Sequence, residues 1–290
     1  LMAGAGKCNI TQAGDIHHFL ECYGPNAKFL KHALLSFQNE DLLALYTFTG
    51  GVPKYIENFI DNGCMSVDEM IDFMMLPDSM FQNEGKTLLI QEFGKKYGNY
   101  FAILSAIANG DNTIPKLNDT TGETTVTGHL KRLEEDYELI TKKRPIFAKD
   151  GTQTVRFEIS DLFLRFWFRY FTKYNDLIET GNLELLGKII KDDYPTYSGL
   201  TLEMYFRQKM AESKEFRNIG SWWQTKKEKI PCEIDFVGIY ADDKHALVAE
   251  VKRQRKNFKP TEFREKVETI RTKILSKYEI DSRCLSMDDM

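Results

Sequence analysis

The segment from residue 232 to residue 253 constrains the fold most, because it carries two strand patterns around one short polar turn. The first pattern is CEIDFVGIY (232–240) and the second is HALVAEVKR (245–253), and both are rich in apolar residues. The turn between them is Ala241–Lys244. Two such runs separated by a few turn residues predict an antiparallel β-hairpin.

The predicted hairpin brings acidic side chains together. A turn centred on Ala241–Lys244 places Asp235 opposite Glu250 and Glu233 opposite Lys252, with all four side chains on one face. Directly opposed like charges destabilise a sheet. One lysine leaves about two negative charges uncompensated, which matches a divalent cation held by oxygen ligands. We therefore expect Asp235 and Glu250 to bind Mg²⁺ or Mn²⁺. The simpler alternative is a Glu233–Lys252 salt bridge beside two hydrated acids.

The same repulsion gives a prediction for stability. Without metal, Asp235→Asn or Glu250→Gln should leave the fold no less stable, because either change removes one of two opposed charges.

The residues around this hairpin predict a C-terminal α/β layer. A helix that carries Glu203 is expected at Leu200–Met210, and a short strand is expected at Ser221–Gln224. A long basic helix is expected at Pro260–Lys277. Helix, strands and helix in this order indicate a domain with its own sheet.

The middle of the chain predicts three short helices and then a hairpin. The helices are expected at Tyr100–Asn109, Ile114–Asn118 and Glu123–Tyr137, and the strands at Leu139–Phe147 and Thr152–Ile159. This is the order of a winged helix-turn-helix, in which the third helix enters the major groove of duplex DNA and the hairpin contacts phosphates. The candidate DNA-binding residues are Thr124, Thr127, His129, Lys131 and Arg132 on the helix, with Lys142, Lys143 and Arg144 at the start of the wing. Winged helices also dock proteins, so this alternative stays open.

The N-terminal part predicts helices at Asp41–Phe48, from Pro53 onward, at Ser66–Met75 and at Glu84–Tyr97. The aromatic segment Asp161–Tyr174 predicts a helix whose rings link the middle domain to the last one.

Charge is unevenly distributed along this acidic chain of net charge −4. Residues 140–173 hold 8 bases and 3 acids, and residues 252–277 hold 10 bases and 3 acids. Concentrated positive charge favours a localised polyanion contact, although a solvated helix face explains the second segment equally well. No apolar run is long enough to span a bilayer, and the first ten residues resemble no targeting signal. The expectation is a cytoplasmic protein without a membrane partner.

At the hairpin the sequence resembles a known superfamily. Asp235, Glu250 and Lys252 match the D and E-x-K of the PD-(D/E)XK nucleases, and Glu203 matches a helix acid that some members add. A wider resemblance includes GGVPKYIENF (50–59), HLKRLEEDYELITKKRPIF (129–147) and FWFRYF (166–171). These segments resemble the C-terminal two-thirds of archaeal-type AAA ATPases, whose tail is a nuclease-like domain of unknown function.

The resemblance implies an α+β multidomain protein. Its expected parts are a helical ATPase-lid-like segment (1–91), a winged-helix domain with an aromatic linking helix (92–175) and a restriction-endonuclease-like α/β domain (176–290). The implied function is a DNA-associated protein with a Mg²⁺-dependent nuclease-like site, in which Asp235, Glu250, Lys252 and Glu203 are the catalytic residues. The alternative is a non-catalytic DNA- or protein-binding regulatory module with a vestigial site. A third, weaker alternative is a signalling ATPase that has lost its nucleotide domain.

A phosphate-binding loop is missing from the expected place. Gly6–Lys7 is followed by Cys8 rather than serine or threonine, and no first glycine precedes it at the required spacing. We therefore expect neither ATP binding nor ATPase activity from this chain alone. The expected partners are duplex DNA and, in full-length relatives, an upstream ATPase domain, and oligomerisation stays compatible with the sequence.

Overall fold

A computed structural model of the chain describes residues 37–94, 97–122, 124–149, 155–224 and 232–290. The Gly6–Lys7–Cys8 segment and Glu123 therefore lie outside the described residues. The chain divides into two compact units: unit 1 comprises residues 1–43, 144–154 and 195–290, and unit 2 comprises residues 44–143 and 155–194. Each unit is described by itself below.

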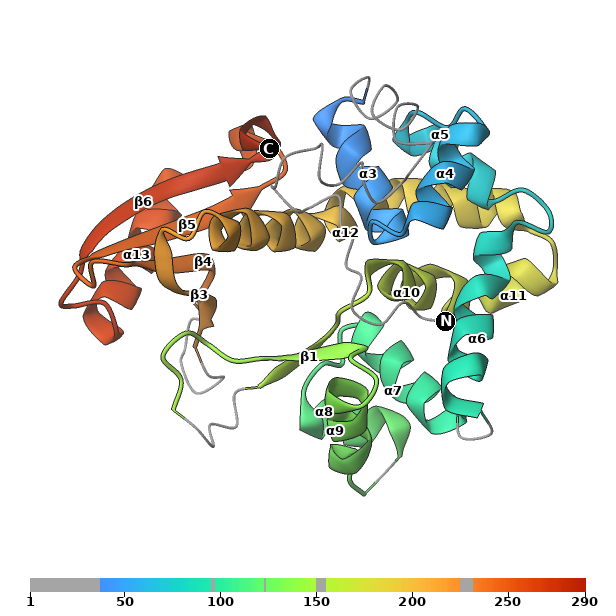
Figure 1. Cartoon of the computed structure of the whole chain (residues 1–290), viewed down its shortest axis with the longest axis horizontal. Helices are drawn as coiled ribbons and strands as arrows, with labels where there is room; N and C mark the ends of the chain where they lie inside the picture. The colour runs from blue at the N-terminus through green and yellow to red at the C-terminus, as the bar shows by residue number, and fades with distance from the viewer. Residues whose placement is uncertain (1–36, 95–96, 123, 150–154, 225–231) are drawn as a thin grey trace. The chain divides into compact units, whose positions relative to one another are not determined.

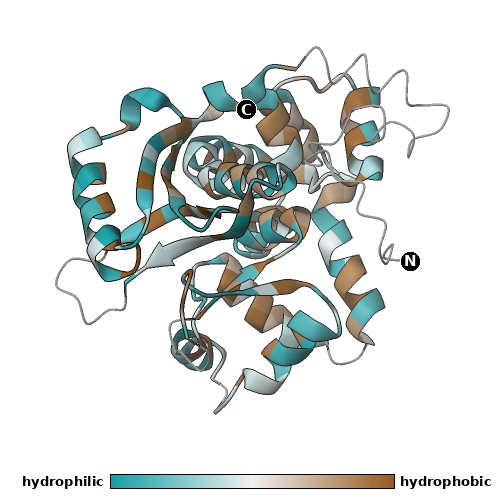
Figure 2. Ribbon diagram, turned by 60° about the vertical axis from the view of Figure 1, so that its left-hand side comes forward, coloured by the Kyte–Doolittle hydropathy of each residue, from teal (hydrophilic) through white to brown (hydrophobic). Residues whose placement is uncertain are grey.

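Within these ranges the chain forms eleven α-helices and two small sheets, which is the mixed α+β architecture that the sequence predicts (Figure 1). Hydrophobic and hydrophilic residues both occur along the helices (Figure 2). None of the helices in the described ranges combines the length and the apolar composition that a bilayer span requires.

Unit 2 contains most of the helices. They are α3 (Asn39–Thr49, from residue 44 onward), α4 (Pro53–Asp61), α5 (Val67–Met74), α6 (Met80–Phe93), α7 (Tyr97–Ala108), α8 (Ile114–Thr121), α9 (Thr127–Glu135), α10 (Leu162–Trp167), α11 (Asn175–Glu179) and the first part of α12 (Leu183–Glu212). The start of α5 follows from local chemistry. The Ser66 hydroxyl accepts from the Glu69 N–H, and the Glu69 carboxylate accepts from the Ser66 N–H. This reciprocal capping box satisfies two N–H groups that the first helical turn leaves unpaired.

Aromatic rings form the core of unit 2. Phe163 lies 4.5 Å from Tyr55, and Phe166 lies 4.9 Å from Phe48, between ring centroids. Phe168 belongs to a π-helical turn (η3, Phe168–Thr172) that follows α10, and it packs 5.2 Å from Phe101. The aromatic segment therefore packs against α3, α4 and α7 within its own unit, and its role as a link to the last domain stays a prediction.

Helices α7, α8 and α9 are followed by a two-stranded hairpin, in the predicted order. Strand β1 (Ile140–Lys143) pairs antiparallel with β2 (Arg156–Ile159). The first strand is shorter than predicted, because the chain leaves the hairpin at Arg144 and joins unit 1. There the Ile146 N–H donates to the Ser221 carbonyl at 2.8 Å, and the Ile146 side chain is buried against Gly220.

Unit 1 is built on a four-stranded sheet of order β3-β4-β5-β6 (Figure 1). Its strands are β3 (Phe216–Trp223), β4 (Glu233–Tyr240), β5 (His245–Lys252) and β6 (Glu279–Ser286). The first three are antiparallel, and β6 lies parallel to β5. In the β4–β5 ladder Phe236 pairs with Ala249 and Ile239 with Ala246, which confirms the register predicted from the turn.

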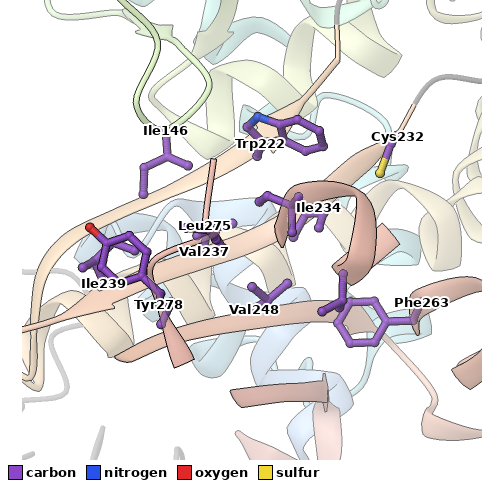
Figure 3. Packing of buried hydrophobic residues seen from close by; sticks show 13 residues of the cluster. Ile146, Trp222, Cys232, Ile234, Val237, Ile239, Val248, Phe263, Leu275 and Tyr278 are labelled. Atoms are coloured by element: carbon purple, nitrogen blue, oxygen red, sulfur yellow. The ribbon is translucent and has the colours of Figure 1, made fainter. Parts of the chain in front are cut away.

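Helices cover both faces of this sheet. On one face Ile234, Val237 and Val248 pack against Phe263 and Ile270 of α13 (Pro260–Lys273), and Figure 3 shows most of the side chains of this cluster. On the other face the strands pack against the second part of α12 in a separate cluster, with Leu202 and Phe206 from the helix and Phe236, Leu247, Ala249 and Val251 from the strands. The two apolar layers fix the position of the polar residues at the strand ends.

Two features of unit 1 differ from the sequence predictions. Helix α12 begins at Leu183 and continues through Pro195, Ser198 and Gly199, where a boundary was expected. Strand β6 was not predicted at all, because its sequence EIDSRCLS is largely polar and only its last three residues are buried. An edge strand that carries charges in this way resists pairing with a second chain.

Candidate functional site

The candidate site lies at the end of the sheet where β4 begins and β5 ends. In an antiparallel pair, the start of one strand adjoins the end of the other, so Asp235 and Glu250 directly adjoin Phe236–Ala249, which is the last pair of the observed β4–β5 ladder. Lys252 follows two residues after Glu250, and its ammonium lies 2.7 Å from Glu250 Oε1. The structure thus brings together three of the four residues that the sequence singles out as catalytic.

Asp235 lies at a β-bulge. Gly220 pairs with Val237 and Trp222 with Ile234, so Asp235 and Phe236 together lie opposite the single residue Ser221. Such a bulge bends the strand and redirects its side chains. The sequence predicted that simple alternation would place all four charged side chains on one face. The bulge interrupts that alternation, so this prediction was wrong. Asp235 Oδ2 instead accepts the backbone N–H of Val251 at 2.8 Å. Burial raises the pKa of Asp235, against the effects of this hydrogen bond and of the Lys252 charge.

Glu250 is held by two ammonium groups. Its side chain is only 11% exposed, and while Oε1 contacts Lys252, Oε2 accepts from Lys266 Nζ of α13 at 3.2 Å. Burial alone would raise the pKa of Glu250, but the two lysines outweigh burial and hold it below its usual value. Lys266 is a member of the cluster that was not predicted from the sequence. The sequence pattern could have indicated it, because Lys266 adjoins the buried face of α13 that Phe263, Val267 and Ile270 form.

Lys252 and Glu203 complete the charged surroundings. Burial opposes the charge of Lys252, but Glu250, Asp235 and Glu203 together raise its pKa above the usual value. Glu203 lies on α12 and forms an ion pair with Arg207 at 3.7 Å. The structure therefore places Glu203 within electrostatic range of the cluster, while this ion pair joins it to a base of its own helix. Lys252 pairs with Glu250 here, whereas the simpler alternative paired it with Glu233.

The charges of the cluster balance one another, whereas the sequence predicted about two uncompensated negative charges. Asp235 and Glu250 face Lys252 and Lys266, so two carboxylates meet two ammonium groups. Among the residues that the structure describes, no three His, Cys, Asp or Glu side chains converge in a group that could hold a metal ion. Both carboxylates remain oxygen donors of the kind that hard cations prefer.

Helix α9 begins at Thr127 and ends at Glu135, so it is shorter than predicted; of the candidate DNA-binding residues assigned to it, Thr124 lies before the helix and the others lie on it. Thr124 and Thr127 are exposed, and Lys131 is exposed beside Glu135 at 3.6 Å. His129 is partly buried, with its ring centroid 5.4 Å from that of Tyr100. Arg132 is exposed, and its pKa is raised by a hydrogen bond with Tyr100.

The candidate residues of the hairpin divide between the two units. Lys142 and Lys143 lie on β1 in unit 2, and Lys143 Nζ is 3.9 Å from Glu158 on β2. Arg144 is exposed and belongs to unit 1. Lys142 and Lys143 are half-buried on the hairpin, so Arg144 is the most accessible of the three.

A cavity of about 750 Å³ lies at the opposite end of the same strands, near the β4–β5 turn. Tyr240, Asp242, His245 and Glu279 contribute to its lining. His245 lies between Asp242 and Glu279, and its pKa is raised mainly by the hydrogen bond with Asp242. Because this imidazole already binds both carboxylates and lies a strand length away from Asp235 and Glu250, we do not assign the cavity to the candidate site.

Fold and site together define an α+β protein with a carboxylate–lysine cluster at one end of a mixed sheet. A family described as archaea bacterial proteins of unknown function, DUF234, matches residues 167–266. That range contains the four cluster residues, Asp235, Glu250, Lys252 and Lys266, and also Glu203. The chain is also 30% identical over 249 residues to the uncharacterized protein MJECL04 of Methanocaldococcus jannaschii, covering 79% of this chain and 54% of that protein. It thus spans about half the length of this relative. No solved structure matches the chain significantly.

Proposed function

We propose that the protein is a DNA-associated protein whose cluster at the β4–β5 end is a Mg²⁺-dependent, nuclease-like site. The observation that carries the proposal is the proximity of Asp235, Glu250 and Lys252, since these residues have the spacing of D and E-x-K in the PD-(D/E)XK nucleases. We also propose that unit 1 has a restriction-endonuclease-like fold. By resemblance it also includes an AAA ATPase domain upstream in full-length relatives.

The donor set fits a hard divalent cation in its chemistry. Asp235 is a partly buried carboxylate whose pKa is raised by burial, and a bound cation would oppose that effect. Glu250 offers a second carboxylate, with Glu203 as a third acid nearby. Asp235 and Glu250 are thus the residues that would hold Mg²⁺ or Mn²⁺. The competing feature is that both oxygens of Glu250 accept from lysines.

The residues divide the chemistry of phosphodiester hydrolysis among them. A bound divalent cation supplies an activated water and polarises the scissile phosphate. Lys252 keeps its proton because three carboxylates raise its pKa, so its ammonium is available to orient water or to stabilise negative charge on the phosphorane. Asp235 is partly buried and Glu250 is buried, so both carboxylates have little contact with bulk water.

Cleavage of supercoiled plasmid tests this proposal. We expect the purified chain to nick DNA with Mg²⁺ or Mn²⁺ and not with EDTA, and Lys252→Met should lower the rate by about 100-fold, because it removes the charge that faces the reacting phosphate. Lys244→Met is the matched control, since Lys244 lies in the β4–β5 turn at the other end of the strands. Equal nicking by the wild type and Lys252→Met would point to a contaminating nuclease.

A second candidate function is a non-catalytic DNA- or protein-binding module with a vestigial site. The pairing of Glu250 with both Lys252 and Lys266 favours it, because a fully paired carboxylate makes a poor metal ligand. Absence of metal-dependent nicking, together with DNA binding that Glu250→Gln leaves intact, would support this candidate over the first.

We further propose that α9 and the β1–β2 hairpin form the reading surface of a winged helix for duplex DNA. What supports this is the order of α7, α8, α9 and hairpin, and the exposure of Thr124, Thr127, Lys131 and Arg132. Protein docking is the alternative use of the same surface. The acids at the end of α9 would repel phosphates there, so contact is expected at the start of the helix.

Binding should depend on salt through the bases at the hairpin. Replacing Lys142, Lys143 and Arg144 together by alanine is expected to weaken binding to all sequences alike. The slope of log affinity against log salt should fall by about one for each side chain that contacts a phosphate, because fewer counterions are released. Fluorescence anisotropy with a labelled duplex at several salt concentrations measures both quantities.

The control for this variant removes three exposed bases from α13 and its N-terminal flank, namely Lys259, Arg264 and Arg271. It lowers the net charge equally and leaves the hairpin intact. If this control lost more affinity than the hairpin variant, the DNA contact would lie on α13 instead.

A further inference from the structure

Lys266 is the feature of the site that the D and E-x-K pattern does not include. It comes from α13, a separate element of unit 1, and its ammonium lies 3.2 Å from Glu250 Oε2. Glu250 Oε1 is engaged by Lys252 at 2.7 Å. The two oxygens of this carboxylate are therefore occupied by ammonium groups from two different elements.

The position of Lys266 follows from the packing of α13. Phe263, Val267 and Ile270 are buried against the sheet, and Lys266 lies one residue before Val267 and three after Phe263. Residues three and four apart on a helix share a face. The long aliphatic stem of Lys266 thus runs at the margin of the apolar layer, with its charged end at Glu250.

The charges make Lys266 a competitor for a metal ion. Two carboxylates, Asp235 and Glu250, already face two ammonium groups, so a divalent cation added to this arrangement would leave an excess of about two positive charges. One ammonium must leave before Glu250 can act as a ligand. Lys252 contacts Glu250 at 2.7 Å and also lies in the field of Asp235 and Glu203, whereas Lys266 contacts Glu250 at the longer distance of 3.2 Å; the two lysine side chains are almost equally exposed. Lys266 is the group that can move into water at the lower cost.

We propose that Lys266 occupies, at Glu250, the place that a divalent cation would take, and that metal binding requires its withdrawal. This inference rests on the proposed function of the site. It assigns to Lys266 a positioning role: it sets the metal affinity of the site and neutralises Glu250 while no metal is bound.

Titration with Mn²⁺ tests the proposal without a measurement of activity. Isothermal calorimetry on the full chain should give roughly tenfold tighter Mn²⁺ binding for Lys266→Met than for the wild type, since the variant removes the competing charge. Arg271→Met is the matched control. Arg271 lies on the same helix, is about half exposed and pairs with Glu268, so its removal changes the net charge equally without touching Glu250. The control should bind Mn²⁺ as the wild type does.

The outcomes separate this inference from the proposed function. Tighter binding by Lys266→Met that disappears in the double variant with Glu250→Gln supports the inference. Equal binding by the wild type and Lys266→Met, abolished by Glu250→Gln, overturns the role of Lys266 but leaves the metal site. Absence of Mn²⁺ binding in all variants overturns both. Should Lys266→Met not fold, Lys266→Gln removes the same charge and keeps a polar end, and the same results decide.

Discussion

The Glu250→Gln variant is expected to be less stable than the wild type by about 2 kcal/mol at pH 7, because it leaves two partly buried ammonium groups without their carboxylate. Glu250 is 11% exposed, and its partners Lys252 and Lys266 are 32% and 31% exposed. This reverses the expectation from sequence, in which repulsion between Asp235 and Glu250 outweighed the single compensating charge of Lys252. Asp235→Asn should still leave the fold no less stable, since burial disfavours the ionised Asp235 and an amide oxygen can accept the Val251 N–H.

The dependence on pH has opposite signs for the two acids. The pKa of Glu250 is lowered in the folded protein, so its stabilising effect is present above the usual carboxyl pKa of about 4.3 and is lost as the pH falls through the lower, folded pKa. The pKa of Asp235 is raised, so its protonation stabilises the fold relative to the unfolded chain as the pH falls through the raised value. Urea denaturation of both variants between pH 3 and pH 7, roughly the range in which carboxyls titrate, measures these effects.

Glu262→Gln is the control for the Glu250 variant. Glu262 pairs with Lys259 on the exposed side of α13, with side chains 63% and 71% exposed. Exposed pairs contribute about 0–1 kcal/mol, so this change should be nearly neutral. A Glu250→Gln protein as stable as the wild type would show that the two lysines contribute nothing and that repulsion from Asp235 dominates.

Gly85→Ala is expected to destabilise unit 2 by about 2–3 kcal/mol, because α6 packs directly on an indole at this residue. A β-carbon at Gly85 would lie 2.2 Å from Trp167 Cδ2 and 2.5 Å from its Cγ. Trp167 is 5% exposed, and its Nε1 donates to the Gln82 carbonyl at 2.8 Å, so the ring cannot withdraw without losing a buried hydrogen bond. The midpoint of urea denaturation should fall while its slope stays constant.

Gly98→Ala provides the matched control within the same unit. Gly98 is an exposed residue of α7, and no atom of the described part of the chain lies within 4 Å of the position that a β-carbon would take there. The substitution should therefore be neutral or stabilising by about 0.5 kcal/mol. If both glycine variants were equally stable, the close approach of α6 to Trp167 would be relieved at no cost and our account of this contact would be wrong.

Local chemistry made parts of the fold predictable. The turn at Ala241–Lys244 sets the β4–β5 register, because its length and its flanking apolar residues allow one pairing that buries both strands. Ser66 was expected to begin a helix, and it does so through its reciprocal bonds with Glu69. In both cases the determining interactions lie within a few residues along the chain.

The features that were missed depend on partners far away in sequence. Helix α12 continues through Pro195 although proline removes one helical hydrogen bond, and its residues Leu202 and Phe206 are buried against the sheet. Strand β6 is recruited by pairing with β5 rather than by an apolar pattern of its own. The cluster was predicted at the level of Asp235, Glu250 and Lys252. The contact of Lys266 with Glu250 was not, because it depends on how α13 packs across the sheet.

The hydrogen bond from the Val251 N–H to Asp235 gives this acid a purely architectural role: it links β4 to β5 just beyond Phe236–Ala249, the last pair of their ladder, at the residue where β4 also bulges against β3. Selection for a well-formed sheet would therefore keep an oxygen acceptor at residue 235 even in a relative that had lost all chemistry. Across an evolving lineage, persistence of this aspartate would not by itself report enzymatic activity.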